Sequence, residues 1–434
     1  MKKGEGIYNV VVIGAGTAGL VTAAGTAGLG GRVALIERNK MGGDCLNFGC
    51  VPSKALISSA RLIQQIRESE KWGLDRQQPQ FVFDKVFERM RARRAKIAPN
   101  DSQERFESLG VDVFHGEARF VSPHEVEVNG QRLRARNFVI ATGSRAAIPQ
   151  IEGIENVPCF TNETIFDELT EKPESMIVLG GGPIGCELGQ AFARLGVKID
   201  IVQSSAELLP REDRDVAEFI QARFTAEAIS VRLNAVAKRV SRGNDKIVLE
   251  FREGEPLARD AMLVAAGRMP NLRALNLEAA CVDYDENGVR VNDYLQTSQL
   301  HIYAAGDIAN RLKFTHTADF TARIVIRNIL MPFQILRQKV DWSVVPWCTY
   351  TDPEVAHVGL GEKEAKQKNI KYDLFVVPLQ DVDRAVVESE DAGFAKILTE
   401  KGSDKILGAD HRGAARRRSF ARVCARHERE DRPW

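Results

Sequence analysis

Two cysteines five positions apart are the strongest candidates for chemistry in this sequence. They lie in the segment Gly42-Gly43-Asp44-Cys45-Leu46-Asn47-Phe48-Gly49-Cys50-Val51-Pro52-Ser53-Lys54. In a regular helix or strand, cysteines at this spacing would lie too far apart for the ~4.4–6.8 Å Cα separation of a disulfide. The neighbouring glycines allow the backbone to bend, so the segment permits a redox-active pair.

The residues after the second cysteine favour a reactive thiol. Pro52 suits the first turn of a helix that continues through Ala55, Leu56 and Ile63. Cys50 would then lie near the N-terminus of that helix, where the helix dipole lowers the pKa of a thiol and favours the thiolate. The alternatives are a zinc site and two unpaired core thiols. Because no other cysteine or histidine supplies ligands at matching spacing, we expect no metal site.

A glycine-rich turn precedes the cysteine segment. A short apolar run, Tyr8–Ile13, is followed by Gly14-Ala15-Gly16-Thr17-Ala18-Gly19 and then by a stretch of helical character. In this strand, turn and helix, Gly14 allows the tight turn, Gly16 lets the backbone approach a pyrophosphate, and Gly19 lets the helix pack closely. A second strand ends at Glu37, where a carboxylate accepts a hydrogen bond from a ribose hydroxyl.

The same pattern occurs a second time after Met176–Leu179. Its glycines are Gly180, Gly182 and Gly185, and the offset that selects Glu37 in the first motif selects Gln203 here. An acid at this position favours NAD and a nearby arginine favours NADP, but the sequence offers Gln203-Ser204-Ser205. The cofactor preference therefore stays open, and the serine hydroxyls leave room for a 2′-phosphate. For each motif, the alternative is a set of glycines that serve only helix packing.

Composition and charge exclude several function classes. The chain has 434 residues, 44% apolar residues, 27% charged residues and a formal net charge of +1. This length suggests roughly two to four domains, and the charge provides no overall field to attract nucleic acid or a membrane surface. The uncharged stretch from Ile7 to Gly31 resembles a signal peptide or membrane span, but its many glycines argue against both. We expect a cytoplasmic protein, and the remaining cysteines are interpreted as buried or incidental thiols: Cys159, Cys186, Cys281, Cys348 and Cys424.

The segment from Gly42 to Lys54 closely resembles the redox-active signature of the class I pyridine nucleotide-disulfide oxidoreductases, the family of dihydrolipoamide dehydrogenase, mercuric reductase and glutathione reductase. The resemblance extends over residues 1 to about 408. Further motifs of the family occur in the expected order: Ala141-Thr142-Gly143, the Gly180 turn with Glu187, Ala305-Gly306-Asp307-Ile308, and Thr351-Asp352-Pro353-Glu354-Val355-Ala356-His357-Val358-Gly359.

This resemblance implies a line of electron transfer and a set of site residues. Cys50 would be the thiol that faces the flavin, and Cys45 the thiol that meets the substrate. Lys54 and Glu187 would pair beside the flavin, although each is alternatively an ordinary surface charge. FAD would bind at Gly14, Gly16, Gly19, Glu37, Gly43, Thr142, Gly143, Gly306 and Asp307, with Asp307 on the ribityl chain. NADH or NADPH would bind at Gly180, Gly182, Gly185, Gln203 and Gly267.

The resemblance also implies the fold class and the domains. We expect an α/β protein with two Rossmann-like domains, one for FAD and one for NAD(P), followed by an α+β dimerisation domain that is incomplete. The FAD domain would comprise residues 1–145 and 271–338, the NAD(P) domain residues 146–270, and the dimerisation domain residues 339–434.

The C-terminus departs from the family pattern. From about residue 409 the sequence becomes an arginine-rich tail, and His427-Glu428 lacks the context of the family's acid/base couple. We interpret this tail as an out-of-frame reading, a hypothesis that sequencing of the gene tests. The alternative is a genuine basic tail for anionic partners. Because the family is homodimeric through this region, its loss would weaken or abolish the dimer.

The substrate is expected to be a thiol, a disulfide or a metal ion, with no nucleic acid or membrane partner. Val51 and the run Arg211-Glu212-Asp213 favour the mercuric reductase branch and hence Hg(II) reduction. The C-terminal vicinal cysteines and the N-terminal metal-binding domain of that branch are not found. Dihydrolipoamide dehydrogenase activity is the first alternative. The second is a catalytically impaired flavoprotein that serves as a binding module.

Overall fold

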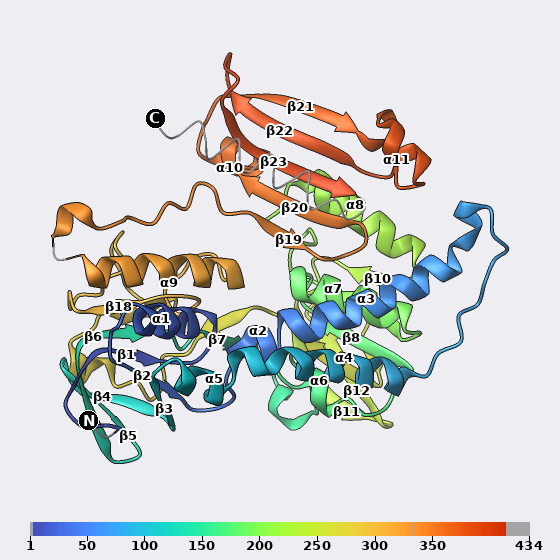
Figure 1. Ribbon diagram of the computed structural model, residues 1–434. Helices are drawn as coiled ribbons and strands as arrows, with labels where there is room; N and C mark the ends of the chain where they lie inside the picture. The colour runs from blue at the N-terminus through green and yellow to red at the C-terminus, as the bar shows by residue number, and fades with distance from the viewer. Residues whose placement is uncertain (1–2, 332, 414–434) are drawn as a thin grey trace. The chain divides into compact units, whose positions relative to one another are not determined.

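Figure 1 shows the computed structural model of the chain, which describes residues 3–331 and 333–413. These residues form two compact units. The first contains the residues up to Pro52, Arg91–Ala146 and Arg268–Asp341. The second contains Ser53–Met90, Ala147–Gly267 and the residues from Trp342 onward.

The first unit is built on a seven-stranded sheet in the order β3-β2-β1-β6-β5-β4, with β18 also paired to β6. The neighbours β3, β2, β1 and β6 run parallel, whereas β4, β5 and the start of β6 form an antiparallel meander. The later part of β6 pairs in parallel with β18. The strands are β1 (Ile7–Ile13), β2 (Val33–Glu37), β3 (Val111–His115), β4 (Ala118–Ser122), β5 (Glu125–Val128), β6 (Gln131–Ile140) and β18 (Ile302–Ala304).

Two helices cover one face of this parallel sheet, α1 (Thr17–Gly28) and α9 (Thr315–Leu330), which lie side by side in Figure 1. Small residues permit this contact, because a Cβ on Gly25 would lie 2.6 Å from the end of Ile326. The opposite face is filled by an apolar cluster around the edge-to-face rings of Phe120 and Phe138. The unit also contains α5 (Gln103–Ser108), β7 (Ser144–Ala146), β15 (Arg268–Pro270), β16 (Tyr284–Asp285) and β17 (Gly288–Val289).

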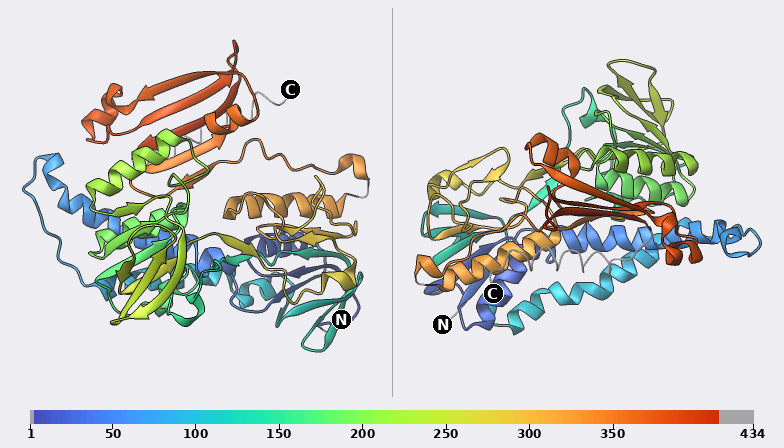
Figure 2. Two further views of the ribbon diagram at one scale, coloured as in Figure 1. Left: turned by 180° about the vertical axis from the view of Figure 1, so that it is seen from behind. Right: turned by 90° about the horizontal axis from the view of Figure 1, so that it is seen from above.

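The cysteine segment forms two consecutive helices, α2 (Gly43–Asn47) and α3 (Cys50–Arg67). Gly42 and Gly43 have positive φ angles of 89° and 56°, which is the backbone bend that the sequence predicts. The start of α3 at Cys50 confirms the predicted helix. Figure 2 shows α3 beside α4 (Phe83–Ile97), and the two share an apolar core that includes Leu56 and Phe87.

The second unit begins with a four-stranded parallel sheet in the order β10-β9-β8-β14. Its strands are β8 (Ser175–Leu179), β9 (Lys198–Val202), β10 (Ser230–Arg232) and β14 (Ala261–Val264), and its helices are α6 (Ile165–Glu168), α7 (Pro183–Arg194) and α8 (Arg214–Ala226). A three-stranded antiparallel sheet follows, made of β11 (Ala237–Gly243), β12 (Lys246–Phe251) and β13 (Leu257–Arg259).

The C-terminal part of the second unit is an antiparallel sheet in the order β19-β20-β23-β22-β21 (Figure 1). Its elements are β19 (Trp347–Thr349), β20 (Glu354–Gly359), α10 (Glu362–Gln367), β21 (Tyr372–Pro378), α11 (Asp383–Val387), β22 (Phe394–Glu400) and β23 (Ile406–Gly413). The tail was predicted to begin at about residue 409, but residues 409–413 continue the central strand β23. Residues 414–434, with His427-Glu428, lie outside the described residues.

A buried lysine joins this sheet to the start of α8. Lys396 on β22 is 0% exposed, and its Nζ lies 2.6 Å from Asp213, 3.1 Å from Asp215 and 3.2 Å from Glu362. Asp213 also accepts hydrogen bonds from the backbone N–H groups of Glu362 and Lys363, at 3.1 and 2.8 Å. The carboxylates satisfy the buried charge, so the two parts of the second unit are held together by an ionic core.

The Rossmann-like sheets and the antiparallel C-terminal sheet confirm the predicted α/β class. The stretch from Ile7 to Gly31 is a strand and a helix, as predicted, and Gly31 follows the end of α1. Among the described residues, none of the helices combines the length and apolar character needed to cross a membrane.

Candidate functional site

The first glycine turn has the geometry of a phosphate-binding loop. Gly14 has a φ of 106°, and a Cβ there would lie 2.4 Å from the carbonyl oxygen of Ala141. A Cβ on Gly19 would lie 1.8 Å from the carbonyl oxygen of Gly14, so only glycine fits. Gly16 caps α1 without a side-chain hydrogen bond, which leaves the N-terminal N–H groups of the helix directed at any anion placed there.

The residues predicted to surround this turn are brought close to it. A Cβ on Gly43 would lie 2.5 Å from Cα of Gly16, so the start of the cysteine segment packs against the turn. Glu37 accepts hydrogen bonds from the backbone N–H of Ala15 and Asn39, both at 2.7 Å. Because a carboxylate has about four acceptor positions, it retains capacity for a ribose hydroxyl.

The second turn has the same construction. Gly180 has a φ of 116°, and a Cβ on Gly185 would lie 1.9 Å from its carbonyl oxygen. The position where a Cβ of Gly182 would lie is open, with no atom within 4 Å. Gln203 accepts a hydrogen bond from the N–H of Gly181 at 2.8 Å and donates one to Ser205. Gly267, with a φ of 125°, lies in the same unit, three residues after the end of β14.

Cys45 and Cys50 are close together in the first unit. Both thiols are half-buried, and they lie within hydrogen-bonding reach of each other. The hydrogen bond to Cys50, followed by burial, raises the pKa of the Cys45 thiol. When the pair is reduced, the two thiols therefore titrate as a coupled pair.

Lys54 and Glu187 form the predicted ion pair, at 2.9 Å between Nζ and Oε2. Glu187 is buried, and its other oxygen accepts a hydrogen bond from the backbone N–H of Tyr350 at 2.9 Å. The Lys54 ammonium lies 4.4 Å from the centre of the Tyr350 ring. Within the second unit, this fixes the lysine one turn after the first residue of α3.

The predicted ribityl contact, Asp307, belongs to a charged network in the first unit. Its carboxylate accepts a hydrogen bond from Ser144 at 2.6 Å and lies 3.6 Å from the guanidinium of Arg268. Arg268 also pairs with Asp44 at 3.0 Å. Burial raises the pKa of Asp307, although the charge of Arg268 opposes this effect.

The remaining predicted flavin residues lie at the ends of neighbouring strands. The Thr142 hydroxyl donates to the carbonyl of Asn271 at 3.0 Å. Gly143 and Gly306 have φ angles of 66° and 79°. At Gly306 a Cβ would lie 3.1 Å from Cβ of Ala18 in α1, so this glycine permits the chain to pass the first turn of that helix. The carboxyl ends of parallel strands thus converge at the first glycine turn.

These arrangements fit the two cofactors that the sequence predicts. Each unit offers an uncapped helix N-terminus behind a glycine turn, and each turn ends on a buried hydrogen-bond acceptor 22 residues beyond the second residue of the turn. The first unit also places Asp307 and the cysteine pair on the elements around its turn. Such sites suit pyrophosphate groups.

Three candidate functional residues were not predicted from the sequence: Thr315, Arg268 and Tyr350. The Thr315 hydroxyl lies 3.1 Å from the sulfur of Cys50, although 265 residues separate them in the chain. No spacing rule predicts such a contact. Arg268 directly follows Gly267, which the sequence predicts as an NAD(P) residue. A charged side chain next to that glycine was the signal that could have identified it.

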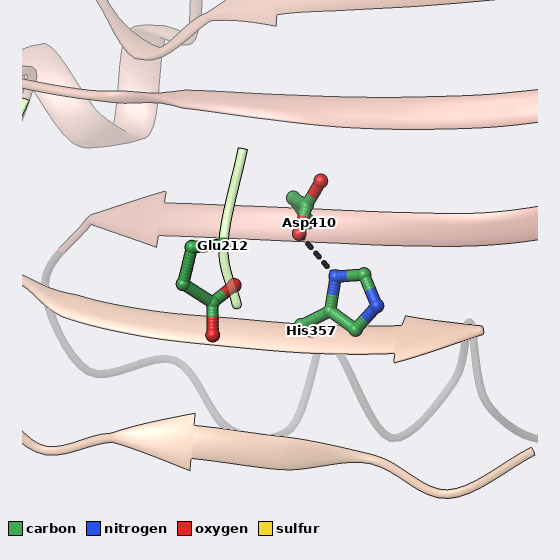
Figure 3. Close-up of side chains that lie close together, drawn as sticks. All are labelled: Glu212, His357 and Asp410. Atoms are coloured by element: carbon green, nitrogen blue, oxygen red, sulfur yellow. Dashed lines mark hydrogen bonds and ion pairs between the residues drawn. The ribbon is translucent and has the colours of Figure 1, made fainter. Parts of the chain in front are cut away.

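A buried cluster in the second unit has the composition of a metal site. Glu212, His357 and Asp410 place their ligand atoms within 4.8 Å of one another (Figure 3). The ring nitrogens of His357 face two acceptors, Asp410 Oδ1 at 2.5 Å and the carbonyl oxygen of Gly359 at 2.8 Å. Two acceptors facing both ring nitrogens favour the doubly protonated, cationic ring.

The electrostatics of this cluster agree with a protonated histidine. Burial lowers the pKa of His357, but the hydrogen bond and the charge of Asp410 outweigh it and raise the pKa above its usual value. The ring of Trp347 stacks on the imidazole at 4.1 Å between centroids, and its Nε1 donates to Glu212 at 2.7 Å. We therefore assign the cluster a structural role in joining β19, β20 and β23 to the Glu212 segment.

Comparison with known proteins gives two family matches. The family described as pyridine nucleotide-disulphide oxidoreductase matches residues 8–322, and the dimerisation domain of the same family matches residues 345–425. A mercuric reductase from Lysinibacillus sphaericus is 35% identical over 408 residues, which cover 93% of this chain and 74% of that protein. A dihydrolipoyl dehydrogenase from Chlamydia muridarum is 32% identical over 407 residues, which cover 93% of this chain and 86% of that protein.

The structure also resembles a solved flavoprotein. The HOCl-induced flavoprotein disulfide reductase RclA from Escherichia coli has a TM-score of 0.87 and 28% identity, covering 98% of this chain and 94% of that chain. Its Cu(II) complex has a TM-score of 0.87 and 26% identity, covering 99% and 96%. The similarity therefore covers both units, including the C-terminal sheet.

Proposed function

We propose that this chain, which belongs to the pyridine nucleotide-disulphide oxidoreductase family and is a flavoprotein disulfide reductase, reduces a thiol-binding metal ion through Cys45 and Cys50, with Hg(II) as the first candidate. The electrons come from NADPH or NADH bound in the second unit. FAD in the first unit supplies the two-electron chemistry that links the nicotinamide to sulfur.

The observation that carries this proposal is the pair of adjacent, half-buried thiols with a hydroxyl beside one of them. Thiolates are the preferred protein ligands of soft metal ions. Two adjacent sulfurs are able to hold such an ion without further residues. Oxidation of a dithiol substrate needs an acid/base group in addition, because two protons must leave its sulfurs.

The electron balance of the proposed reaction is simple. One hydride from the nicotinamide carries two electrons, which reduce Hg(II) to Hg(0) and leave NAD(P)⁺ and a proton. Cys45 and Cys50 bind the metal ion as thiolates, and the pair is not consumed. Thiolate formation releases the protons of the reduced thiols.

Dihydrolipoamide oxidation with NAD is the second candidate, supported by the 32% identical dihydrolipoyl dehydrogenase. A Cu(II) substrate is supported by the Cu(II) complex of the bacterial reductase of similar fold. A further alternative is a flavoprotein without turnover that serves as a binding module. The same assay separates all of these.

The test uses the full chain with its flavin bound. Under anaerobic conditions we expect NADPH or NADH to reduce the flavin, and Hg(II) with excess small thiol to support continued oxidation of the nucleotide. Cys45→Ser and Cys50→Ser should each lower this turnover by about 100-fold or more. Cys281→Ser, which changes an exposed cysteine, is the matched control and should retain turnover within about twofold.

Faster turnover with dihydrolipoamide and NAD than with Hg(II) would reverse the order of the two candidates. Preference for Cu(II) over Hg(II) would keep the metal class and change the ion. A protein that is purified with flavin but oxidises NADPH with none of these substrates would overturn the proposal in favour of the binding module.

A further inference from the structure

Thr315 occupies an unusual place at the start of α9. Its Oγ1 lies 3.1 Å from the sulfur of Cys50. Two other threonines of this helix use their hydroxyls on its own backbone: Thr317 donates to the carbonyl of Phe314 at 2.7 Å, and Thr321 donates to that of Thr317 at 2.8 Å. The Thr315 hydroxyl is instead directed at the sulfur pair.

The direction of this hydrogen bond follows from the chemistry of sulfur. A thiol is a weak donor and a weak acceptor, whereas a thiolate only accepts. When Cys50 is a thiolate, the Thr315 hydroxyl must therefore donate to it, and a hydrogen bond to a charged acceptor is stronger than one to a neutral acceptor. The hydroxyl thus favours the charged form of the pair over the neutral form.

The same hydroxyl acts on the second sulfur. A hydrogen bond from Thr315 lowers the pKa of Cys45, which the hydrogen bond to Cys50 and burial otherwise raise. The charge of Asp44 also raises the Cys45 pKa, but Asp44 is itself paired with Arg268 at 3.0 Å. The direct contact of Thr315 is nevertheless with Cys50, at 3.1 Å.

We propose that Thr315 is a positioning residue that stabilises the thiolate of the reduced Cys45/Cys50 pair and holds its negative charge on Cys50. This inference rests on the proposed electron path, in which Cys50 faces the flavin. The N-terminus of α3, which begins at Cys50, supplies a second stabilising influence of the same sign. The hydroxyl also distinguishes the two sulfurs, because its contact at 3.1 Å is with Cys50.

The experiment measures the long-wavelength absorbance that a thiolate beside an oxidised flavin produces. The flavin-loaded full chain is reduced by two electrons under anaerobic conditions, and the band is titrated with acid. Thr315→Val removes the hydroxyl and keeps the side-chain shape, so the pH midpoint of the band should rise by about one unit or more. Thr315→Ser keeps the hydroxyl and should restore the wild-type midpoint to within about 0.3 unit.

Matched controls separate this effect from loss of structure. Thr225→Val makes the same change on α8, where the hydroxyl is exposed and bonds the carbonyl of Gln221 at 3.0 Å, and should leave the band unchanged. Flavin content and melting temperature of each variant report whether α9 has folded. Should Thr315→Val fail to bind flavin, Thr315→Ala and Thr315→Ser form the comparison.

An unchanged pH midpoint of the band in a flavin-loaded Thr315→Val protein overturns the inference. A raised midpoint in Thr315→Ser as well as in Thr315→Val overturns it too. If the wild-type protein itself shows no such band on two-electron reduction, the proposed electron path fails instead. The two failures are thus distinguishable.

Discussion

The two glycine turns of this chain share one backbone geometry and end on chemically different side chains. Gly14 donates to the carbonyl of Ile36 at 2.8 Å, and Gly180 donates to that of Val202 at the same distance. Glu37 closes the first turn through the N–H of Ala15 at 2.7 Å. Gln203 closes the second through the N–H of Gly181 at 2.8 Å.

This comparison separates two tasks of one position. Closing the turn requires only a buried acceptor oxygen, which a carboxylate and an amide supply equally well. Discriminating among ribose groups requires charge, because a carboxylate attracts hydroxyl donors and repels a phosphate. Glu37 closes its turn and carries a charge, whereas Gln203 closes its turn without one.

The largest effects are expected from closing the space that the glycines leave. Gly19→Ala and Gly185→Ala place a Cβ within 2 Å of a backbone carbonyl oxygen, at 1.8 and 1.9 Å. Each should destabilise its unit by about 3 kcal/mol. We expect Gly19→Ala to be purified without flavin, and Gly185→Ala to retain flavin that NADPH no longer reduces.

Absorbance of bound flavin and stopped-flow reduction measure these two outcomes. Gly28→Ala at the end of α1 is the control, since a Cβ there has no atom within 4 Å. If Gly185→Ala is reduced by NADPH at the wild-type rate, the second turn is not the nicotinamide site.

The next largest effect concerns the ionic core of the second unit. Lys396→Met leaves the buried carboxylate of Asp213 without its cation at 2.6 Å, which should lower the free energy of unfolding by about 3–5 kcal/mol. The double variant Lys396→Met/Asp213→Asn should recover part of this loss. Calorimetry of the flavin-loaded protein measures both, and equal stability of the single variant and the wild type would show that this core is not stabilising.

This ionic core also shows what sequence reasoning missed. The sequence indicates only a resemblance of the run Arg211-Glu212-Asp213 to the mercuric reductase branch. In the structure, Glu212 accepts a hydrogen bond from Trp347, and Asp213 forms an ion pair with Lys396. These partners lie more than 130 residues away in the chain. Because such contacts depend on tertiary packing, no local pattern reveals them.

The glycine turns were predictable for the opposite reason. Strand, positive-φ glycine and helix follow one another within a few residues, so local physics determines their structure. The pairing of Lys54 with Glu187 required the family resemblance, because 133 residues separate the two. Thr315, 265 residues from Cys50, is found only by looking at the folded chain.

A smaller effect tests how the second unit responds to acid. Burial alone would raise the pKa of Glu68, but hydrogen bonds from Lys71 and Gln64 and the charge of Arg223 lower it to about 2. Because this folded value lies below the unfolded value of 4.5, the stabilisation is present above pH 4.5 and is lost as the pH falls toward 2. Glu68→Gln should therefore lower stability by about 2 kcal/mol at pH 7, and this difference should vanish in acid.

Melting temperatures of the wild type and the variant between pH 3 and 7 measure this convergence. Tyr8 in the first unit does not titrate between pH 3 and 7, because burial and the hydrogen bond to Asp112 raise its pKa to about 12. Tyr8→Phe is therefore the control. Parallel profiles for Glu68→Gln and the wild type would contradict the assignment.

The smallest effect returns to the position at which the two turns differ. Gln203→Glu keeps an acceptor oxygen for the N–H of Gly181 but adds a charge where a 2′-phosphate would lie, so KM for NADPH should rise about tenfold while KM for NADH changes less. Steady-state oxidation of the two nucleotides measures the ratio. Gln203→Met removes the acceptor oxygen and opens the turn without adding charge. It should therefore raise KM for NADPH and for NADH by the same factor. If glutamate and methionine change the ratio equally, the position acts only by closing the turn, and discrimination between the two nucleotides must arise from the serines that follow it.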